Sequence, residues 1–362
     1  MHLIKKILIL VIIIASFVII YKLTKENEII KQEIQKQVAE RNIQREGFST
    51  SMDELQKSAE KKGLELTIKP LSAKYADFPL REFMIKSSYN TAIVNKTADK
   101  DAIIFALTRG CRVLDFEVYT RKIMNGKDEE YVSYSDDPEY RTIKTALNLT
   151  LENALNNVAA NAFSSPSPAP TDPLFIQLRI KNNSNDAYNR ISKMIEKIFG
   201  SRLYVGEPVN GSTPINKLIG KVVIVLDALS APDYDRYSTC MNDPGCVPLT
   251  KRVGLVSGTV DLPKYSYTDY YDLTQTPVMV DPKTQRTDVR TFMMVTPPEI
   301  GGDKITIPDE DSLTRLPIQM LLVPFYKQTD DLKKYEETFN KCESSFCTMG
   351  QIFKEHNKKN AE

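Results

Sequence analysis

Two acidic residues, Asp115 and Glu117, are the residues of this chain best placed to do chemistry together. They stand two apart in the segment 112–118, whose pattern predicts a strand. A period of two sets both carboxylates on one face of that strand and places Leu114 and Phe116 on the other. The pair is therefore the first candidate for a functional site.

The residue counts exclude several kinds of function. Only two histidines occur, His2 and His356, one near each end, so a histidine-based acid/base mechanism inside the folded domain is excluded. The apolar and charged fractions, 41% and 26%, are typical of a globular protein. The formal net charge of +1 and the lack of a basic stripe with interleaved aromatics argue against nucleic acid as a partner.

The N-terminal region has the pattern of a membrane anchor. Residues 7–21 are apolar apart from Ser16, and the stretch 3–23 reaches about 20 residues, the length that a bilayer core requires. A cleaved signal peptide is the alternative, but the apolar run continues past Ala15 without a small-x-small cleavage site. We therefore expect residues 1–24 to be an uncleaved transmembrane anchor. Lysines flank the run on both sides, so the orientation stays open.

Three further regions follow the anchor. Residues 25–64 are rich in Lys, Glu and Gln and predict an amphipathic helical stalk or linker. From 65 to 345 strand and helix patterns alternate, which favours a parallel sheet with helices outside. The segment 346–362 is expected to be a polar C-terminal tail. The predicted strands are 83–86, 112–118, 174–180, 222–227, 291–295 and 318–325, and the predicted helices are 102–107, 143–162, 188–198 and 330–339.

The five cysteines are too few for a disulfide scaffold in a chain of this length. Cys111 falls in a predicted strand and reads as a buried apolar residue. Two pairs of cysteines are each close enough in sequence for a local disulfide, and reduced thiols are an equal alternative. Neither pair has the spacing of a zinc site. Four glycosylation sequons do not settle the compartment. The pairs are Cys240 with Cys246 and Cys342 with Cys347, and the sequons begin at Asn95, Asn148, Asn182 and Asn210.

Three motifs carry a resemblance to a known family: Ser87-Ser-Tyr-Asn-Thr91, Gly110-Cys-Arg112 with its following acidic strand, and Gly220-Lys-Val222. In this order they resemble the X region and trailing barrel strands of phosphatidylinositol-specific phospholipases C, over about 81–339. The resemblance implies an α/β fold, a distorted TIM-type (β/α) barrel of about 260 residues. Divergent membrane-anchored members encoded by large DNA viruses are similar, which suggests a single-pass protein of a host or virion membrane.

The resemblance implies that both catalytic histidines of the family are replaced. The first lies between Ser-Ser and Asn-Thr, where this chain has Tyr89, and the second matches Tyr134 within Val132-Ser-Tyr-Ser135. An unperturbed phenol titrates near pH 10 and is a poor base at neutral pH. General acid/base catalysis typically contributes ~10²–10⁴-fold per group, so losing both groups should reduce the family reaction to near background.

The family's calcium site also looks degenerate. The resemblance implies metal ligands at Asn90, Asp115 and Glu117, but the family's next acidic ligand is matched by Arg179. Calcium takes six to eight oxygen ligands, and an adjacent guanidinium opposes it. We therefore expect an empty site in which Arg179 neutralises Asp115 and Glu117. If that expectation is correct, the chain uses no metal cofactor.

Substrate recognition looks eroded as well. The strand after Lys221 carries phosphate-contacting lysines in the eukaryotic enzymes, and the matching positions here are Val225 and Asp227. An acid beside a polyanionic inositol headgroup would repel it. Lys221 is a weak candidate for substrate binding, because a lone lysine is more often an ordinary surface residue.

The sequence therefore predicts a catalytically inactive member of the phospholipase C-like family, held in a membrane by its N-terminal helix. Its role would be binding or structural, with a phospholipid or a protein as partner. The alternative is an active phosphoric diester hydrolase that uses Asp115, Glu117, Arg179 and Tyr89, with calcium as the cofactor that the family implies.

Overall fold

The computed structural model describes residues 66–94, 97–123, 126–135, 149–181, 184–237, 240, 246–273, 278–298, 316–325 and 329–359. The chain divides into two units, 1–58 and 59–362. The first unit lies outside the described residues, as do the predicted anchor, 1–24, and the predicted stalk, 25–64. Among the helices that are described, none combines the length and the hydrophobicity needed to cross a membrane.

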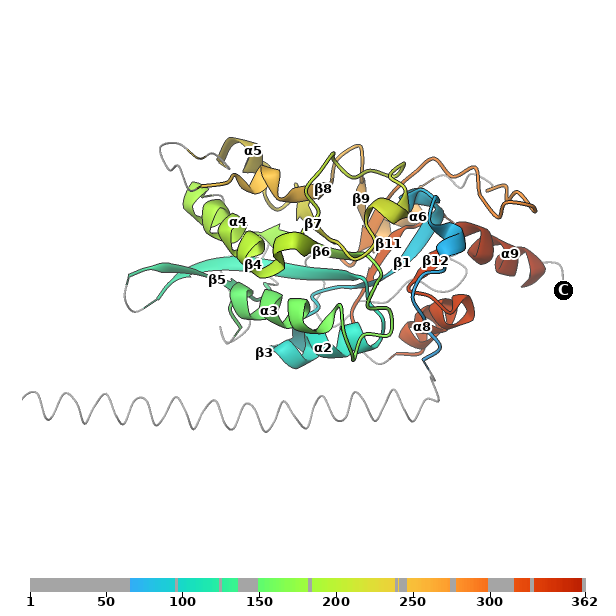
Figure 1. The fold of residues 1–362 in the computed structure, drawn as a ribbon, viewed down its shortest axis with the longest axis horizontal. Coiled ribbons are helices and arrows are strands. Elements are labelled where there is room, and N and C mark those ends of the chain that lie inside the picture. The colour runs from blue at the N-terminus through green and yellow to red at the C-terminus, as the bar shows by residue number, and fades with distance from the viewer. Residues whose placement is uncertain are drawn as a thin grey trace, which may run out of the picture. The chain divides into compact units, whose positions relative to one another are not determined.

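Parallel strands form the wall of a nearly closed barrel. Their order is β8-β7-β6-β4-β1-β11-β10-β9, and within the described residues the ladder is open between β8 and β9. Figure 1 shows helices on both sides of these strands, as expected for a distorted TIM-type barrel. The strands are β1 (Phe83–Ser88), β4 (Val113–Lys122), β6 (Leu174–Ile180), β7 (Val222–Asp227), β8 (Val253–Ser257), β9 (Lys264–Ser266), β10 (Met294–Thr296) and β11 (Met320–Val323).

Alternate side chains of each strand divide between the barrel interior and the covering helices. In β6, Ile176 and Leu178 join an apolar cluster that includes helical residues such as Ile191. Phe175 belongs to a second cluster with Phe83, which fills the interior. Both faces are thus buried, and this explains why the strand reads as a nearly continuous apolar run. The polar residues that interrupt the run, Gln177 and Arg179, lie on the interior face with Phe175.

Four covering helices begin at polar residues whose side chains accept a hydrogen bond from the first turn, which satisfies an otherwise unpaired backbone N–H. These caps are Asp99, Thr150, Ser184 and Thr329. The helices are α2 (Lys100–Thr108), α3 (Leu151–Asn161), α4 (Asn185–Phe199), α5 (Tyr234–Tyr237), α6 (Tyr267–Tyr271), α8 (Asp330–Cys342) and α9 (Met349–Lys359). Short 3-10 turns cover Ala73–Tyr75, Leu80–Glu82, Gly200–Arg202, Ile215–Lys217 and Leu249–Lys251.

The prediction of a polar tail over 346–362 is wrong in its first part. Residues Phe346–Thr348 form β12, which pairs antiparallel with β1, and α9 follows directly. The Phe346 ring lies 6.0 Å from that of Phe83 inside the barrel cluster, so burial of this aromatic side chain favours the strand. The other additions to the barrel are β5 (Asp128–Val132), which pairs with β4, and the hairpin of β2 (Ile93–Val94) with β3 (Thr97–Ala98).

Two charged side chains are buried at the end of the barrel where β4 and β6 begin. The guanidinium of Arg112 donates hydrogen bonds to oxygens of the loop 162–169. The Asp172 Oδ1 atom accepts a hydrogen bond from the backbone N–H of Leu71 at 2.8 Å. Burial raises the pKa of Asp172 to about 6, although the bond from Leu71 and the charge of Arg112 both act to lower it.

We expect Asp172→Asn to change how stability depends on pH. The folded pKa of about 6 lies above the ordinary value of 3.8. Asp172 therefore stabilises the fold below pH 4, and this contribution is lost as the pH rises through 6. Relative to wild type, the variant should gain about 2 kcal/mol in free energy of unfolding between pH 4 and pH 7. Urea unfolding at both pH values measures the change; an identical difference at the two values contradicts the raised pKa.

Candidate functional site

The two carboxylates and the arginine singled out from the sequence lie on neighbouring strands. In the parallel register of β4 with β6, Glu117 is opposite Arg179 and Asp115 is opposite Gln177. The apolar residues that alternate with the two carboxylates in β4, Leu114 and Phe116, pack outward into the cluster that contains the helices. The charged side chains therefore face the barrel interior near the C-terminal ends of the strands, where TIM-type barrels keep their sites.

Arg179 binds both carboxylates and Asn90 at once. Its Nε and Nη2 donate to the two carboxylate oxygens of Asp115, each at 2.9 Å, in a bidentate pair. Its Nη1 donates to Glu117 Oε2 at 2.7 Å, and Nη2 also donates to Asn90 Oδ1 at 2.5 Å. Asp115 and Arg179 are 0% and 1% exposed, so the cluster is buried. We call these four residues the Arg179 cluster.

The turn after β1 fixes the position of Asn90. Asn90 adopts a φ of 43°, a left-handed conformation that asparagine tolerates better than most residues. Its backbone N–H donates to Asp115 Oδ2 at 2.9 Å. Thr91 exchanges two further bonds with Asp115, because the Asp115 N–H donates to Thr91 Oγ1 and the Thr91 N–H donates to the Asp115 carbonyl. The turn and β4 therefore hold the Asn90 side chain against Arg179.

The loop after β5 closes over Glu117. Its Oε1 accepts hydrogen bonds from the Tyr119 hydroxyl and from the backbone N–H of Ser135 at 3.2 Å. The N–H of Ser133 donates to the Glu117 carbonyl oxygen. Tyr134, which the family resemblance matches to the second histidine, therefore has its backbone beside Glu117. Its half-buried side chain packs against the cluster that contains the helices.

Tyr89, which the family resemblance matches to the first histidine, lies directly at the Arg179 cluster. Its ring centroid is 4.9 Å from the Arg179 guanidinium carbon, within the range of a cation–π contact. Burial would lower the pKa of Arg179, but Asp115, Tyr89 and Glu117 outweigh it and hold that pKa well above its usual range. The cluster therefore carries a permanent cation among its two carboxylates.

The residues of this site do not fit a calcium ion. Calcium needs six to eight oxygen ligands. The side-chain oxygens that would supply them, on Asn90, Asp115 and Glu117, are those that accept hydrogen bonds from Arg179. A guanidinium bound to these oxygens occupies the ligands' lone pairs and adds like charge to the cation. Elsewhere in the described part of the chain no group of three or more His, Cys, Asp or Glu side chains gathers to hold a metal.

A second buried ion pair lies inside the barrel, and no pattern in the sequence predicted it. Lys264, at the start of β9, pairs with Asp227, at the end of β7, at 3.2 Å. Asp227 also accepts hydrogen bonds from Ser230 at 2.6 Å and from Ser257 at 3.3 Å. Because β8 and β9 do not pair within the described residues, the bridge from Lys264 to Asp227 spans the opening of the barrel.

The structure does not bring the remaining candidates into the site. Lys221 precedes β7, at the opposite end of that strand from Asp227, and its exposed Nζ donates to the carbonyl of Ser201. It is placed as an ordinary surface lysine. Val225 lies in the apolar cluster of the barrel interior. Lys221 therefore lies at the other end of the barrel from the Arg179 cluster, and the apolar side chain of Val225 offers no polar group to it.

We expect Lys264→Met to destabilise the barrel by about 2 kcal/mol, because Asp227 then stays buried with only its serine partners. The side chains are 5% and 0% exposed, so water cannot replace the lost ammonium. The double variant Lys264→Met/Asp227→Asn should recover most of the loss, since no buried charge is left unpaired. Urea unfolding of the variants tests this; an equal loss in the single and double variants contradicts the ion-pair explanation.

Comparisons with known proteins give one family match and several structures with a similar fold. The family model described as "Phosphatidylinositol-specific phospholipase C, X domain" matches residues 76–226. No curated protein matches the chain by sequence. The crystal structures of PLC21 from L. pealei and S. officinalis are similar, with TM-scores of 0.52 and 0.51 and identities of 12% and 13%. The alignments cover 75% and 76% of this chain and 37% of each of those chains, so this chain spans little more than a third of their length.

A calcium-dependent phosphoinositol-specific phospholipase C from Pseudomonas sp. is also similar, with a TM-score of 0.44 and 12% identity over 72% of this chain and 95% of that chain. The family match spans the whole Arg179 cluster, from Asn90 on the turn after β1 to Arg179 on β6. The PLC21 structures share the fold. The match to the X domain, which is part of the phospholipase C-like phosphodiesterase superfamily, covers residues 76–226, less than half of the chain, and the similarity to the PLC21 structures is one of fold.

Proposed function

We propose that this chain is a membrane-anchored member of the superfamily that no longer hydrolyses phosphodiesters and has a binding or structural role. The observation that carries the proposal is the Arg179 cluster. One guanidinium fills the space and the charge of the metal that the family resemblance implies, and it engages Asn90, Asp115 and Glu117 together. The site is then a cluster in which the charge of Arg179 balances the carboxylates, rather than a metal centre.

The proton-transfer groups support the same proposal. The chain has only two histidines, and neither occurs within the matched residues 76–226. Tyr89 stacks on Arg179 instead of standing free to accept a proton from a nucleophile. A phenol at neutral pH is also a weak base. Loss of the metal and loss of the bases are separate changes, and each alone removes a large part of the family's rate acceleration.

The membrane association is proposed from the sequence. The apolar run 3–23 with its flanking lysines has the length and composition of a single span. A barrel tethered in this way is held at a lipid surface whatever its activity. A phospholipid headgroup or a membrane protein is therefore the kind of partner that we propose, in preference to nucleic acid.

We expect the purified protein neither to bind calcium nor to release inositol phosphate from phosphatidylinositol vesicles above the rate without protein. Calorimetric titration with calcium chloride and the release assay with and without calcium test the two parts. A calcium-dependent phosphatidylinositol phospholipase C, assayed in parallel, is the positive control. Saturable calcium binding by wild type contradicts the assignment of Arg179 as the occupant of the metal position.

A second candidate function, an active hydrolase with unusual residues, is favoured by one observation: the raised pKa of Arg179 provides a permanent cation beside Tyr89. Such a cation can stabilise charge on a phosphoryl group in a transition state. Asp115→Asn distinguishes the two functions. Wild-type turnover that disappears in this variant supports the hydrolase and contradicts the proposed loss of activity.

A further inference from the structure

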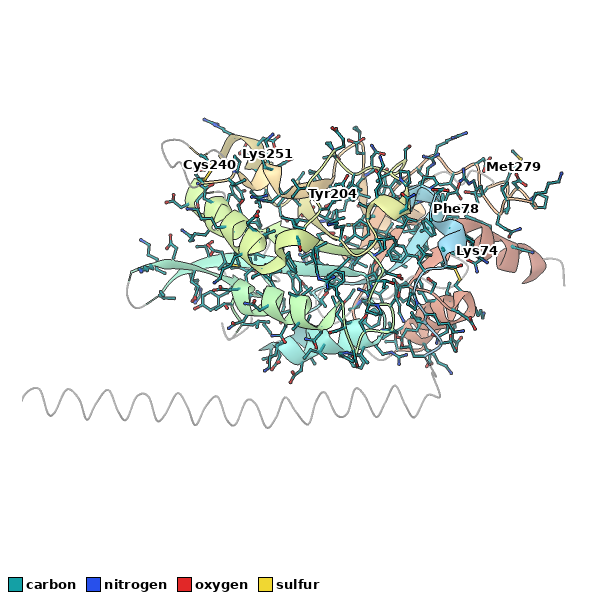
Figure 2. All side chains as sticks on the ribbon, in the orientation of Figure 1. Lys74, Phe78, Tyr204, Cys240, Lys251 and Met279 are labelled. Atoms are coloured by element: carbon teal, nitrogen blue, oxygen red, sulfur yellow. A yellow bond between two sulfur atoms is a disulfide. The ribbon has the colours of Figure 1, made fainter. Side chains whose placement is uncertain are left out.

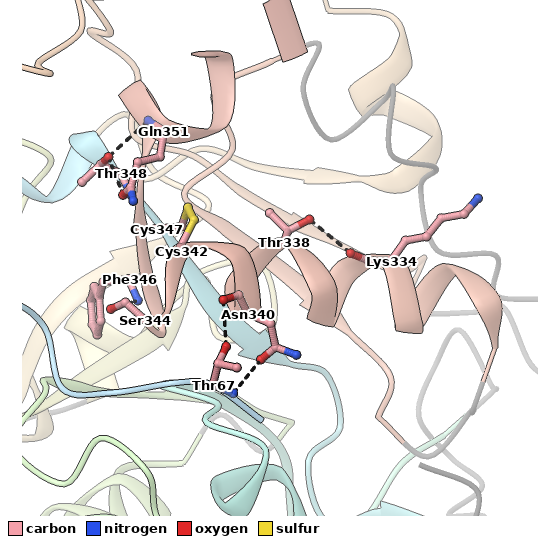
Figure 3. Close-up of a disulfide and its surroundings, with 10 residues drawn as sticks. All are labelled: Thr67, Lys334, Thr338, Asn340, Cys342, Ser344, Phe346, Cys347, Thr348 and Gln351. Carbon is pink, nitrogen blue, oxygen red and sulfur yellow. Dashed lines mark hydrogen bonds between the residues drawn. A yellow bond between two sulfur atoms is a disulfide. The ribbon is translucent and has the colours of Figure 1, made fainter. Parts of the chain in front are cut away.

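Both cysteine pairs that the sequence left open are disulfides. Cys240 bonds to Cys246 and Cys342 to Cys347, with Cα atoms 5.5 Å apart in each pair. Figure 2 shows Cys240 near α5. Figure 3 shows the second bond where α8 meets β12, next to Asn340, which accepts a hydrogen bond from Thr67. Disulfides form and persist in oxidising compartments, so the two bonds indicate that the barrel folds in such a compartment.

In that compartment a glycosylation sequon becomes a potential acceptor. Of the four sequons in the chain, only Asn210-Gly-Ser212 has its asparagine within the described residues. Asn210 is exposed, in the segment that leads from the short turn Gly200–Arg202 to the turn Ile215–Lys217. An exposed acceptor is required if the folded barrel is to carry a glycan without rearrangement.

The loop around Asn210 is fixed on its inner side and open on its outer side. A Cβ atom on Gly211 would lie 2.7 Å from Cβ of Phe292, so the backbone of Gly211 packs closely against that side chain. Arg81 donates to Ser212 Oγ at 2.6 Å and holds the third sequon residue. The side-chain oxygen of Asn210 accepts the Ser212 N–H at 2.8 Å, and its nitrogen donates no hydrogen bond within the described residues.

The loop also lies away from the Arg179 cluster. The Leu80 N–H donates to the Thr213 carbonyl just before β1 begins, and the Val209 N–H donates to the carbonyl of Gly254 near the start of β8. These contacts put the loop at the N-terminal ends of the strands, whereas the Arg179 cluster lies toward their C-terminal ends. A glycan on this loop would leave the barrel mouth uncovered.

We propose that Asn210 carries an N-linked oligosaccharide. The Asn210 Nδ2 atom forms a bond to the anomeric carbon of a sugar donated by a lipid diphosphate-linked oligosaccharide, the bond from that carbon to the diphosphate breaks, and the amide loses one proton. The proposal does not depend on the lost hydrolase activity. If residues 3–23 anchor the chain, the barrel then lies on the side of the membrane away from the cytosol.

The tryptic peptide Leu203–Lys217 makes the test specific, because it contains Asn210 and no other sequon. The full chain is produced in eukaryotic cells that perform N-glycosylation, digested, and treated with peptide N-glycosidase in ¹⁸O-water. We expect the peptide to appear only after treatment, with residue 210 converted to labelled aspartate. Recovery of the peptide with unmodified Asn210 overturns the proposal.

Two variants provide matched controls. Asn210→Asp keeps an oxygen that can accept the Ser212 N–H but removes the acceptor nitrogen, so it should lose the glycan and retain the fold. Ser212→Thr keeps both the hydroxyl and the sequon and should remain glycosylated. A glycosidase-sensitive modification of the Leu203–Lys217 peptide that persists in Asn210→Asp overturns the assignment.

The disulfides are tested on the same material by alkylation before reduction. We expect the four paired cysteines to resist alkylation until a reductant is added, whereas buried Cys111 becomes reactive on unfolding alone. Alkylation of all four without reductant overturns the compartment argument on which the glycan rests. The paired cysteines are Cys240, Cys246, Cys342 and Cys347.

Discussion

Replacing Arg179 with methionine is expected to lower the free energy of unfolding by at least about 3–5 kcal/mol, the usual cost of removing one partner from a buried ion pair. The change leaves two carboxylates, Asp115 and Glu117, in an interior where they are 0% and 2% exposed. Asp115 loses both hydrogen bonds of its bidentate pair, and Glu117 loses its contact at 2.7 Å. Urea unfolding followed by circular dichroism measures the loss.

Two further variants show whether charge is the cause. In Arg179→Met/Asp115→Asn/Glu117→Gln no buried charge remains, and most of the loss should be recovered even if the single variant does not fold. Lys197→Met removes an exposed ion pair with Glu152, whose atoms are 2.8 Å apart, and should cost no more than about 1 kcal/mol. If Arg179→Met lowers the free energy of unfolding as little as Lys197→Met does, the result contradicts a buried charge cluster.

The sequence pattern predicted those strands in which apolar and polar residues alternate, or apolar residues run on, for six or more positions. The predicted strands 174–180 and 222–227 coincide with β6 and β7, because both faces of these strands are buried. The shared facing of Asp115 and Glu117 followed from the period of a strand alone. The partner that completes the cluster is 62 residues away from Glu117 in the sequence, and only the family resemblance pointed to Arg179.

The elements that the sequence did not reveal are short or depend on distant partners. Strand β9 has three residues, Lys264–Ser266, and each residue as a whole, backbone included, is of intermediate exposure, so no alternation of buried and exposed positions marks it. Strand β12 is stabilised by pairing with β1, more than 250 positions earlier in the chain. The pair of Lys264 with Asp227 arises where the barrel curves back on itself. The spacing of residues along the sequence does not predict which strands meet when the barrel closes.

A substitution that reverses the charge at position 179 should recreate a calcium-dependent barrel. In Arg179→Glu a third carboxylate joins Asp115 and Glu117, and without metal the repulsion should make this variant less stable than wild type. Calcium that binds only the folded form should then stabilise it by about 2.7 kcal/mol at a hundredfold excess over the dissociation constant. Thermal unfolding with and without calcium measures this, and Arg179→Gln, which adds no charge, is the matched control.

Turnover should need the histidines as well. Arg179→Glu alone should remain near background in inositol phosphate release, since general acid/base groups each contribute ~10²–10⁴-fold and the family resemblance implies that both are replaced. Adding Tyr89→His and Tyr134→His to Arg179→Glu should raise the rate in a calcium-dependent way, and either histidine alone should give much less. Position 89 already lies at the cluster, 4.9 Å from the guanidinium of Arg179. A triple variant that binds calcium but stays inactive would show that substrate contacts, such as those altered at Asp227, were lost along with the metal and the bases.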